Sequence, residues 1–514
     1  MSENQTPPSK RQNLSSLLIG RPLETRTLAH QVISNKVGLA VFASDAISST
    51  AYATEEILVI LALTGTMAYL GLSVPIAIAI SILLIIVTVS YRQTIFAYPN
   101  GGGAYIVARE NLGETAALVA GSALLTDYVL TVAVSISSGV AQIISAFPSL
   151  TDFRVPMAVG IIAFVTLMNL RGVRESGTVF AVPTYFFVIM MFLTIAVGFY
   201  RWANGTLGVV TGVEFVTETA APLTLFLIMR AFSSGSTALT GIEAISNGIT
   251  AFREPKSKNA ARTLVVMSTL LVILFLGITF LSRHIEAIPS HEETIISQLA
   301  RTVYGNGSIL YLFVIAGTAL VLLMAANTSY ADFPRLAALQ AADGFLPRQL
   351  TYRGGRLVFS WGIMTLALAA SLLVIVMRAS TTALIPLYAI GVFLSFTLSQ
   401  SGMVIHYRKV GKLQPGEIVK LPDSKLEYDS KWRLHMLISG VGATLTFIVM
   451  LIFAITKFAS GAWVVIIIIP TLVFIFSRMH RHYKDVAQAL SLENAHCQIK
   501  TDKVVTLLLV DGVH

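Results

Sequence analysis

Long stretches without any charged side chain recur along most of this chain. The stretches 69–90, 178–200 and 358–377 each hold about 20 residues and contain no Asp, Glu, Lys or Arg. An α-helix of that length crosses the hydrocarbon core of a bilayer. Only 12% of all residues are charged, which is about half the share found in soluble proteins. Because such stretches occur about a dozen times, a membrane domain makes up most of the protein.

The length of these stretches and the charges that flank them predict twelve transmembrane helices, and therefore an all-α membrane protein. The predicted spans cover residues 36–64, 68–90, 117–146, 156–172, 178–200, 222–252, 263–282, 308–334, 358–377, 381–405, 435–456 and 460–477. They form one twelve-helix domain at 35–477 between two cytoplasmic tails, 1–34 and 478–514. In the second tail, residues 503–510 are typical of a buried strand, with which a C-terminal α/β domain would start.

The distribution of basic residues predicts the orientation of these helices. With the N-terminus in the cytoplasm, 29 of the 36 Lys and Arg residues fall on the cytoplasmic side and one, Arg230, falls inside a span. The other side holds six, which are Arg154, Arg201, Arg283, Arg301, Arg378 and Lys457. Short cytoplasmic loops of membrane proteins carry such an excess. The net charge of +9 therefore indicates topology rather than nucleic-acid binding, and we expect a multi-pass protein of the bacterial inner membrane with a cytoplasmic N-terminus.

Two predicted spans place small and hydroxyl-bearing residues around a carboxylate. The first span contains SDAISSTAY at 44–52, and the sixth contains SSGSTALTGIE at 233–243. Their starts lie five spans apart, so the two helices cross the membrane in opposite directions. A LeuT-like inverted repeat of five plus five helices has this pattern, with interrupted first and sixth helices at the substrate site. We therefore expect breaks near 44–48 and 233–236, where backbone groups are unpaired within the helix, and two extra helices after the repeat.

Three carboxylates are predicted to lie inside spans close to hydroxyl groups: Asp45, Asp127 and Glu243. Thr131 and Ser135 follow Asp127 by four and eight residues, so all three lie on one helix face. Oxygen ligands of this kind suit hard cations, and a charge at mid-membrane is costly and usually functional. The alternatives are close packing of helices through the small residues and hydroxyl groups that bond their own helix.

Three other carboxylates and Arg230 also fall inside the predicted spans. Glu55 and Glu56 are expected in the outer half of the first span and Asp332 at the cytoplasmic end of the eighth. They form a polar vestibule, lie past the true end of the span, or bind the ion directly, and the first two alternatives are favoured. Arg230 lies close enough to the outer surface to reach water. It is also the one intramembrane cation that could neutralise Asp45 permanently, in which case that pair would be structural.

No pattern of residues typical of catalysis occurs in the sequence. There is no zinc-ligand spacing, no Ser/His/Asp arrangement and no nucleotide-binding fingerprint. The single cysteine, Cys497, excludes a disulfide framework. We therefore expect a protein that is not an enzyme and that needs no cofactor.

Five long motifs resemble one group of transporters. They are SDAISSTAY (44–52), YPNGGGAYIVARENLG (98–113), TDYVLTVAVSIS (126–137), FSSGSTALTGIEAISN (232–247) and IPLYAIGVFLSFTLSQ (385–400). All five are similar to the KUP group of potassium/proton symporters, and in particular to its KimA branch, within the amino acid, polyamine and organocation transporter superfamily. The resemblance runs from Leu18 over essentially the whole chain.

The resemblance implies potassium uptake coupled to proton entry, with potassium as the substrate. The potassium-binding positions that it implies are Asp45, Tyr52, Asp127, Thr131, Ser135, Thr240, Glu243 and Tyr388, and the residues implied in proton coupling are Glu243 and Asp127. It also implies a homodimer. Members of the KimA branch carry a cytoplasmic domain that binds an inhibitory cyclic dinucleotide, and this sequence contains only the first strand of such a domain.

Two other functions remain open at this stage. An amino acid or polyamine permease would share the fold, although Asp45 and the absence of glycine between Ser44 and Thr54 disfavour a substrate carboxylate. A sensor that binds an ion or ligand without moving it belongs to another class. Interrupted helices in an inverted repeat favour alternating access over a static sensor.

Overall fold

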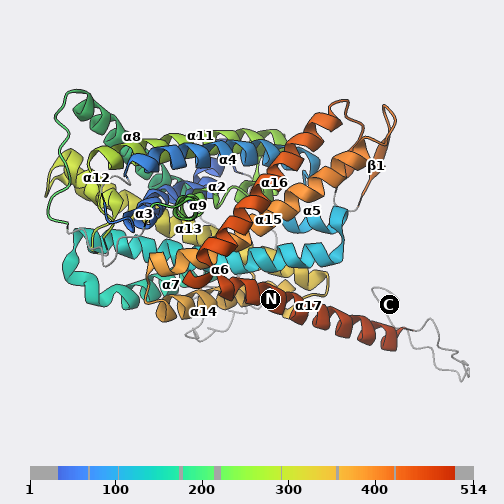
Figure 1. Ribbon diagram of the computed structural model, residues 1–514. Coiled ribbons are helices and arrows are strands. Elements are labelled where there is room, and N and C mark those ends of the chain that lie inside the picture. The colour runs from blue at the N-terminus through green and yellow to red at the C-terminus, as the bar shows by residue number, and fades with distance from the viewer. Residues whose placement is uncertain are drawn as a thin grey trace, which may run out of the picture.

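The computed structural model describes residues 33–491, apart from 67–69, 102, 173–177, 214–221, 291, 355–357 and 422–423. Most of the predicted N-terminal tail and the predicted strand at 503–510 lie outside the described residues. The described part is a bundle of long helices with a single two-stranded hairpin (Figure 1). This confirms the all-α membrane class.

Ten helical segments in the described ranges are long and apolar enough to cross a membrane. They are α4 (Leu70–Ala97), α6 (Glu114–Ala146), η3 with α7 (Pro148–Leu170), α8 (Thr178–Ala203), α9 to α10 (Leu225–Asn247), α11 (Lys256–His284), α13 (Ile309–Ala342), α15 (Thr381–Val410), α16 with η7 (Trp432–Ser460) and α17 (Ala462–Leu490). The two other predicted spans correspond to the pair α2 (Asn35–Ser48) and α3 (Thr50–Ala62), and to the shorter α14 (Ser360–Val376). That all twelve segments span the membrane stays a prediction.

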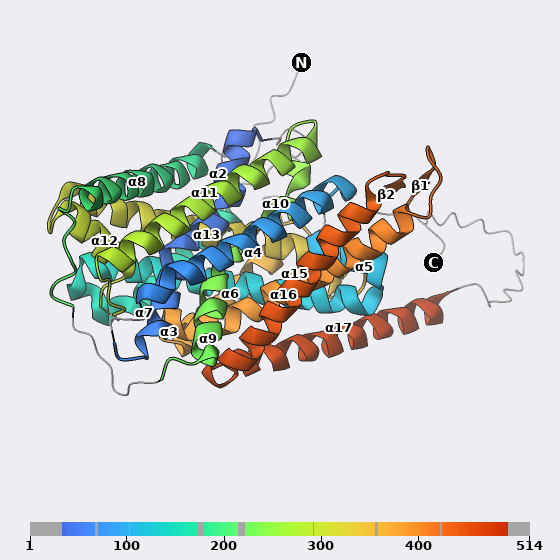
Figure 2. The same ribbon diagram turned by 45° about the horizontal axis from the view of Figure 1, so that its top comes forward.

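Short elements mark the two ends of the bundle (Figures 1 and 2). One end, called the α5 end below, carries α5 (Gly103–Leu112) and the antiparallel hairpin of β1 (Ile418–Lys420) and β2 (Lys425–Glu427). The opposite end, called the α12 end, carries α12 (Ile295–Tyr304). Helix α17 (Ala462–Leu490) continues past the last predicted span, which ends at 477, and its last turns extend beyond the bundle at the α5 end.

The central and peripheral helices differ in how much apolar surface they expose. The central α6 packs against α13, α15 and α5, and most of its residues are buried. The peripheral helices expose large apolar side chains such as Phe164, Val182, Leu368 and Phe474. Such a surface suits hydrocarbon and would be unfavourable in water.

The first predicted interruption is present, but it lies one residue beyond the predicted stretch. Helix α2 continues through Ser48, so the expectation of unpaired backbone at 44–48 is wrong, and α3 starts at Thr50. The hydroxyl groups of Ser48, Ser49 and Thr50 each donate to the carbonyl three residues earlier, over 2.7, 2.6 and 2.7 Å. Bonds of this kind compete with the helix ladder and bend helices.

The second interruption is longer than the first. Helix α9 (Leu225–Gly235) changes to the 3-10 turn η4 (Ser236–Leu239), and Thr240 is extended before α10 (Ala244–Asn247) begins. Gly241 has φ +81°, a left-handed conformation in which glycine carries no steric penalty. The predicted stretch 233–236 contains the start of this irregular region, whose sharpest turn lies at 240–241.

Candidate functional site

The two interruptions lie against each other. The Ser49 hydroxyl donates to the Ala238 carbonyl over 3.2 Å. A Cβ at Gly241 would lie 2.7 Å from the backbone nitrogen of Ala46 and 2.9 Å from Asp45 Oδ2. Only glycine therefore allows this approach, which brings the Asp45 carboxylate against the irregular part of the α9–α10 segment.

All eight predicted potassium ligands are buried around these interruptions. Their exposed fractions range from 0% to 8%, for Asp45, Tyr52, Asp127, Thr131, Ser135, Thr240, Glu243 and Tyr388. They come from α2, α3, α6, the α9–α10 segment and α15. Sequence positions more than 300 residues apart therefore contribute to one interior region.

Hydroxyl groups connect four of these elements. Thr131 Oγ1 donates to the Tyr388 hydroxyl over 3.0 Å, which joins α6 to α15. The Tyr52 hydroxyl interacts with those of Thr240 and Tyr388. Ser135 is buried on α6 two turns after Asp127.

The carboxylates of this region are close enough to act on one another and are incompletely paired. Asp127 experiences the charges of both Glu243 and Asp45. One oxygen of Asp45 and one of Asp127, Oδ1 in each case, are buried without a hydrogen-bond partner. Buried polar atoms are normally satisfied, so two bare carboxylate oxygens among hydroxyl groups suit a cation. In the described part of the chain, no three acidic, His or Cys side chains converge tightly enough to hold a metal alone, so a bound ion would also need the hydroxyl oxygens.

Glu243 has a partner that our sequence reasoning missed. Its Oε2 accepts a hydrogen bond from Ser395 Oγ over 3.0 Å. Ser395 lies seven residues, or two helical turns, after Tyr388 on α15, so both side chains project from the same face. That spacing was available in the sequence and would have identified Ser395.

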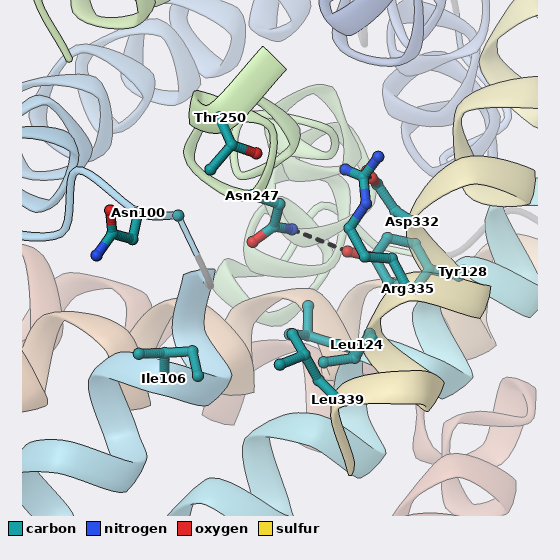
Figure 3. A pocket seen from close by; sticks show the side chains of 11 residues that line it. Asn100, Ile106, Leu124, Tyr128, Asn247, Thr250, Asp332, Arg335 and Leu339 are labelled. Atoms are coloured by element: carbon teal, nitrogen blue, oxygen red, sulfur yellow. Dashed lines mark hydrogen bonds and ion pairs between the residues drawn. The ribbon is translucent and has the colours of Figure 1, made fainter. Parts of the chain in front are cut away.

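A cavity of about 160 Å³ lies beside this cluster at the α5 end, where Ile106 of α5 and Leu339 of α13 line it (Figure 3). Tyr128 directly follows Asp127, and Asn247 lies four residues after Glu243; both line the cavity. The Asn247 amide donates to the Tyr128 hydroxyl over 2.9 Å. Asp332 also lines the cavity.

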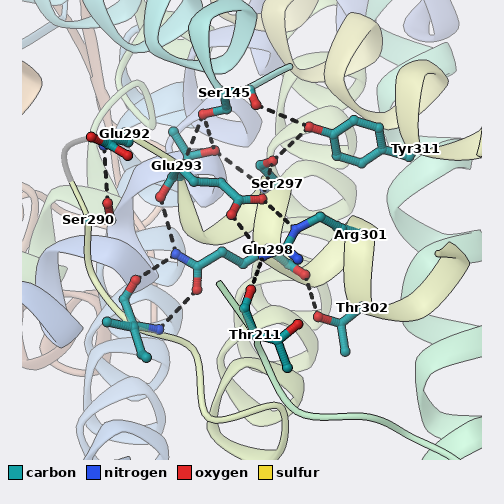
Figure 4. Close-up of polar contacts among 12 residues, drawn as sticks. Ser145, Thr211, Ser290, Glu292, Glu293, Ser297, Gln298, Arg301, Thr302 and Tyr311 are labelled. Carbon is teal, nitrogen blue, oxygen red and sulfur yellow. Dashed lines mark hydrogen bonds and ion pairs between the residues drawn. The ribbon is translucent and has the colours of Figure 1, made fainter. Parts of the chain in front are cut away.

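At the opposite end, a polar network fixes α12 over the bundle (Figure 4). Arg301 pairs with Glu293 at 2.9 Å, and the Ser145 hydroxyl accepts from the backbone nitrogen of Thr294 over 3.0 Å. Glu55 Oε2 accepts from the Ile295 backbone nitrogen over 3.3 Å, which attaches α3 to the first turn of α12. Glu55 is thus a structural contact at the α12 end.

Arg230 lies away from Asp45. It donates to Ser460 Oγ over 3.1 Å and acts on the buried carboxylate of Glu56. Among its described contacts none reaches Asp45, so the structure gives no support to a permanent Arg230–Asp45 pair. Lys457, expected on the outer surface, is only 3% exposed, because its helix packs against α9 and its charge faces Glu56.

Two comparisons place the chain among known proteins. A family model for amino acid permeases matches residues 38–476. The potassium transporter KimA of Bacillus subtilis (strain 168) is 44% identical over 481 residues, which are 93% of this chain and 76% of KimA. Matches of this extent confirm the resemblance to the KimA branch, and the chain belongs to the amino acid permease family of membrane transporters.

Proposed function

We propose that this protein imports potassium by alternating access. The observation that carries the proposal is the pair of buried, unpartnered carboxylate oxygens on Asp45 and Asp127, surrounded by hydroxyl groups at two interrupted helices. An ion of charge +1 supplies what these oxygens lack, and alternating access is the mode of transport that interrupted helices serve. The similarity to a protein named as a potassium transporter supports the same substrate.

An amino acid substrate fits this region poorly. Its carboxylate would meet the charges of Asp45, Asp127 and Glu243, which are buried close together. Charges of like sign that are held in a dry site give strong discrimination. A polyamine would not be repelled, so it belongs among the competitors in the test below.

We propose that protons enter with potassium and that Glu243 carries them, with Asp127 as the second candidate. Glu243 is only 3% exposed and lies in the irregular segment of the sixth span. A carboxyl group away from water favours its neutral form, and a nearby cation favours its charged form. Proton binding and potassium binding at Glu243 would therefore depend on each other, which is the requirement for coupling.

The α5 end is the cytoplasmic end in this proposal. The excess of Lys and Arg in the loops assigned to that side supports it. The cavity is lined by residues near this end, among them Asn100 and Ile106, while the network around α12 covers the opposite one. The described conformation would then be one that communicates with the cytoplasm.

Tracer uptake by the purified protein in proteoliposomes tests the proposal. We expect rubidium tracer to accumulate when the outside is acidic, and unlabelled potassium to compete with it. Alanine and putrescine, added separately in excess, should leave uptake unchanged. Uptake of labelled putrescine or alanine without rubidium uptake would favour a permease for organic substrates. Saturable rubidium binding without any accumulation would favour a sensor.

A further inference from the structure

The cavity at the α5 end has only two charged side chains in its lining, Asp332 and Arg335. Both belong to α13 and lie about one turn apart. The Asp332 side chain is 6% exposed and that of Arg335 is 40% exposed, with 3.6 Å between Asp332 Oδ1 and Arg335 Nη1. Figure 3 shows the guanidinium group beside the carboxylate at the wall of the cavity. The buried carboxylate of Asp332 is thus neutralised by the guanidinium group of Arg335, which remains accessible to water.

Asp332 is electrostatically connected to the candidate potassium site. Its charge acts on both Asp45 and Glu243. It is also the one carboxylate in the lining of the cavity, so a cation that leaves the site through the cavity meets it. A buried carboxylate in a narrow cavity concentrates cations, and alone it would hold potassium at the inner mouth, in a compartment that is rich in potassium.

We propose that Arg335 is a tethered counter-ion that occupies Asp332 and so allows potassium to leave the inner mouth of the transporter. This inference rests on the proposed function. The separation of 3.6 Å is longer than that of a tight charge-assisted hydrogen bond, so the pair is loose. A passing cation can displace the guanidinium group and is displaced by it in turn. With Arg335 in place, the cavity still attracts a potassium ion in transit but does not retain it.

A purely structural role for the pair makes a different prediction. Because the Asp332 side chain is only 6% exposed, removing its partner leaves a buried charge uncompensated, and a structural role would lower the amount of folded protein. It would not change how internal potassium inhibits uptake. The concentration of internal potassium that halves the initial rate of uptake therefore separates the two roles.

The experiment uses proteoliposomes that contain the full chain and are loaded with graded potassium concentrations. The initial rate of rubidium uptake is measured under one fixed pH gradient. In Arg335→Gln, we expect the internal potassium concentration that halves uptake to fall by roughly three- to tenfold, with the KM for external rubidium unchanged. The double variant Asp332→Asn/Arg335→Gln should return to the wild-type value, because no bare carboxylate remains.

Two further variants complete the test. Arg353→Gln removes the same charge at the same end of the bundle from a residue that lies over the Phe359 ring and outside the cavity, so it should behave as wild type. Arg335→Lys keeps a cation beside Asp332 and should also behave as wild type, whether or not Arg335→Gln folds well. Three results would each overturn the inference. They are a wild-type response to internal potassium in Arg335→Gln, a defect that persists in the double variant, and a defect in Arg335→Lys equal to that of Arg335→Gln. With active wild-type protein, such a result leaves the proposed function intact, whereas absence of uptake by the wild type overturns both.

Discussion

Replacing Gly241 by alanine is expected to force the two interrupted helices apart. Gly241 has φ +81°, and an L-residue in this region is destabilised by about 1–2 kcal/mol. The new Cβ would also lie 2.7 Å from the backbone nitrogen of Ala46. Since unstrained contacts of carbon lie at about 3.5 Å or more, the α2 backbone must move by roughly 0.8 Å.

This shift would displace the Asp45 carboxylate, because its Oδ2 lies 2.9 Å from the same Cβ position. A hydrogen bond or contact that involves a charged group contributes about 1.5–3 kcal/mol. Since about 1.4 kcal/mol corresponds to a tenfold change in affinity, loss of one such contact should raise the KM for potassium by roughly 10- to 100-fold. The amount of protein in the membrane should fall much less.

Initial rates of rubidium uptake over a range of external concentrations give this KM. Gly416→Ala, in the turn before β1, is a matched control, since Gly416 has φ +87° and no atom lies within 4 Å of an added Cβ. This control variant introduces the same backbone strain without a steric clash. A wild-type KM in Gly241→Ala would refute the contact that we describe, and equal defects in both variants would assign the effect to strain alone.

Three other predictions follow from the site and the topology. Asp45→Asn keeps the shape of the side chain and removes its charge, so the protein should reach the membrane but fail to support growth at limiting potassium; normal growth would contradict its role as a ligand. Glu243→Gln should retain rubidium binding and lose the uptake that a pH gradient drives, and full gradient-driven uptake would exclude Glu243 as the proton carrier. With Cys497 replaced by serine, a new cysteine at the exposed Asp152 should react with an impermeant external reagent and one at the exposed Lys420 should not. The reverse labelling pattern would show that the bundle has the opposite orientation in the membrane.

The helical bundle was predictable because each span must be long and apolar to cross a bilayer. The ends of the helices were less predictable. Helix α13 was expected to end at 334 and continues to Ala342, and α15 was expected to end at 405 and continues to Val410. Counting apolar residues locates the hydrocarbon region, whereas a helix continues into water until its end is capped.

The candidate site was only partly predictable from the residues themselves. The density of hydroxyl groups indicated where the first helix weakens, but the break at Ser49 depends on a contact with Ala238 that lies 189 residues away. Likewise, helical spacing placed Thr131 on the face of Asp127, whereas the bond from Thr131 to Tyr388 spans 257 residues. Periodicity within one helix carries no information about such partners, and only the family resemblance had named Tyr388.

The hydroxyl groups at the two interruptions also bear on which substrate the site accepts. Ser48, Thr50, Thr237 and Thr240 each lie within 2.9 Å of the carbonyl three residues earlier. A carbonyl oxygen can only accept, so each hydroxyl must donate its single proton to it. What these oxygens then present to their surroundings is lone pairs, which attract a cation and offer nothing to a carboxylate. The same bonds that loosen the two helices therefore orient the site toward positive charge, and together with Asp45 and Asp127 they favour potassium over an amino acid.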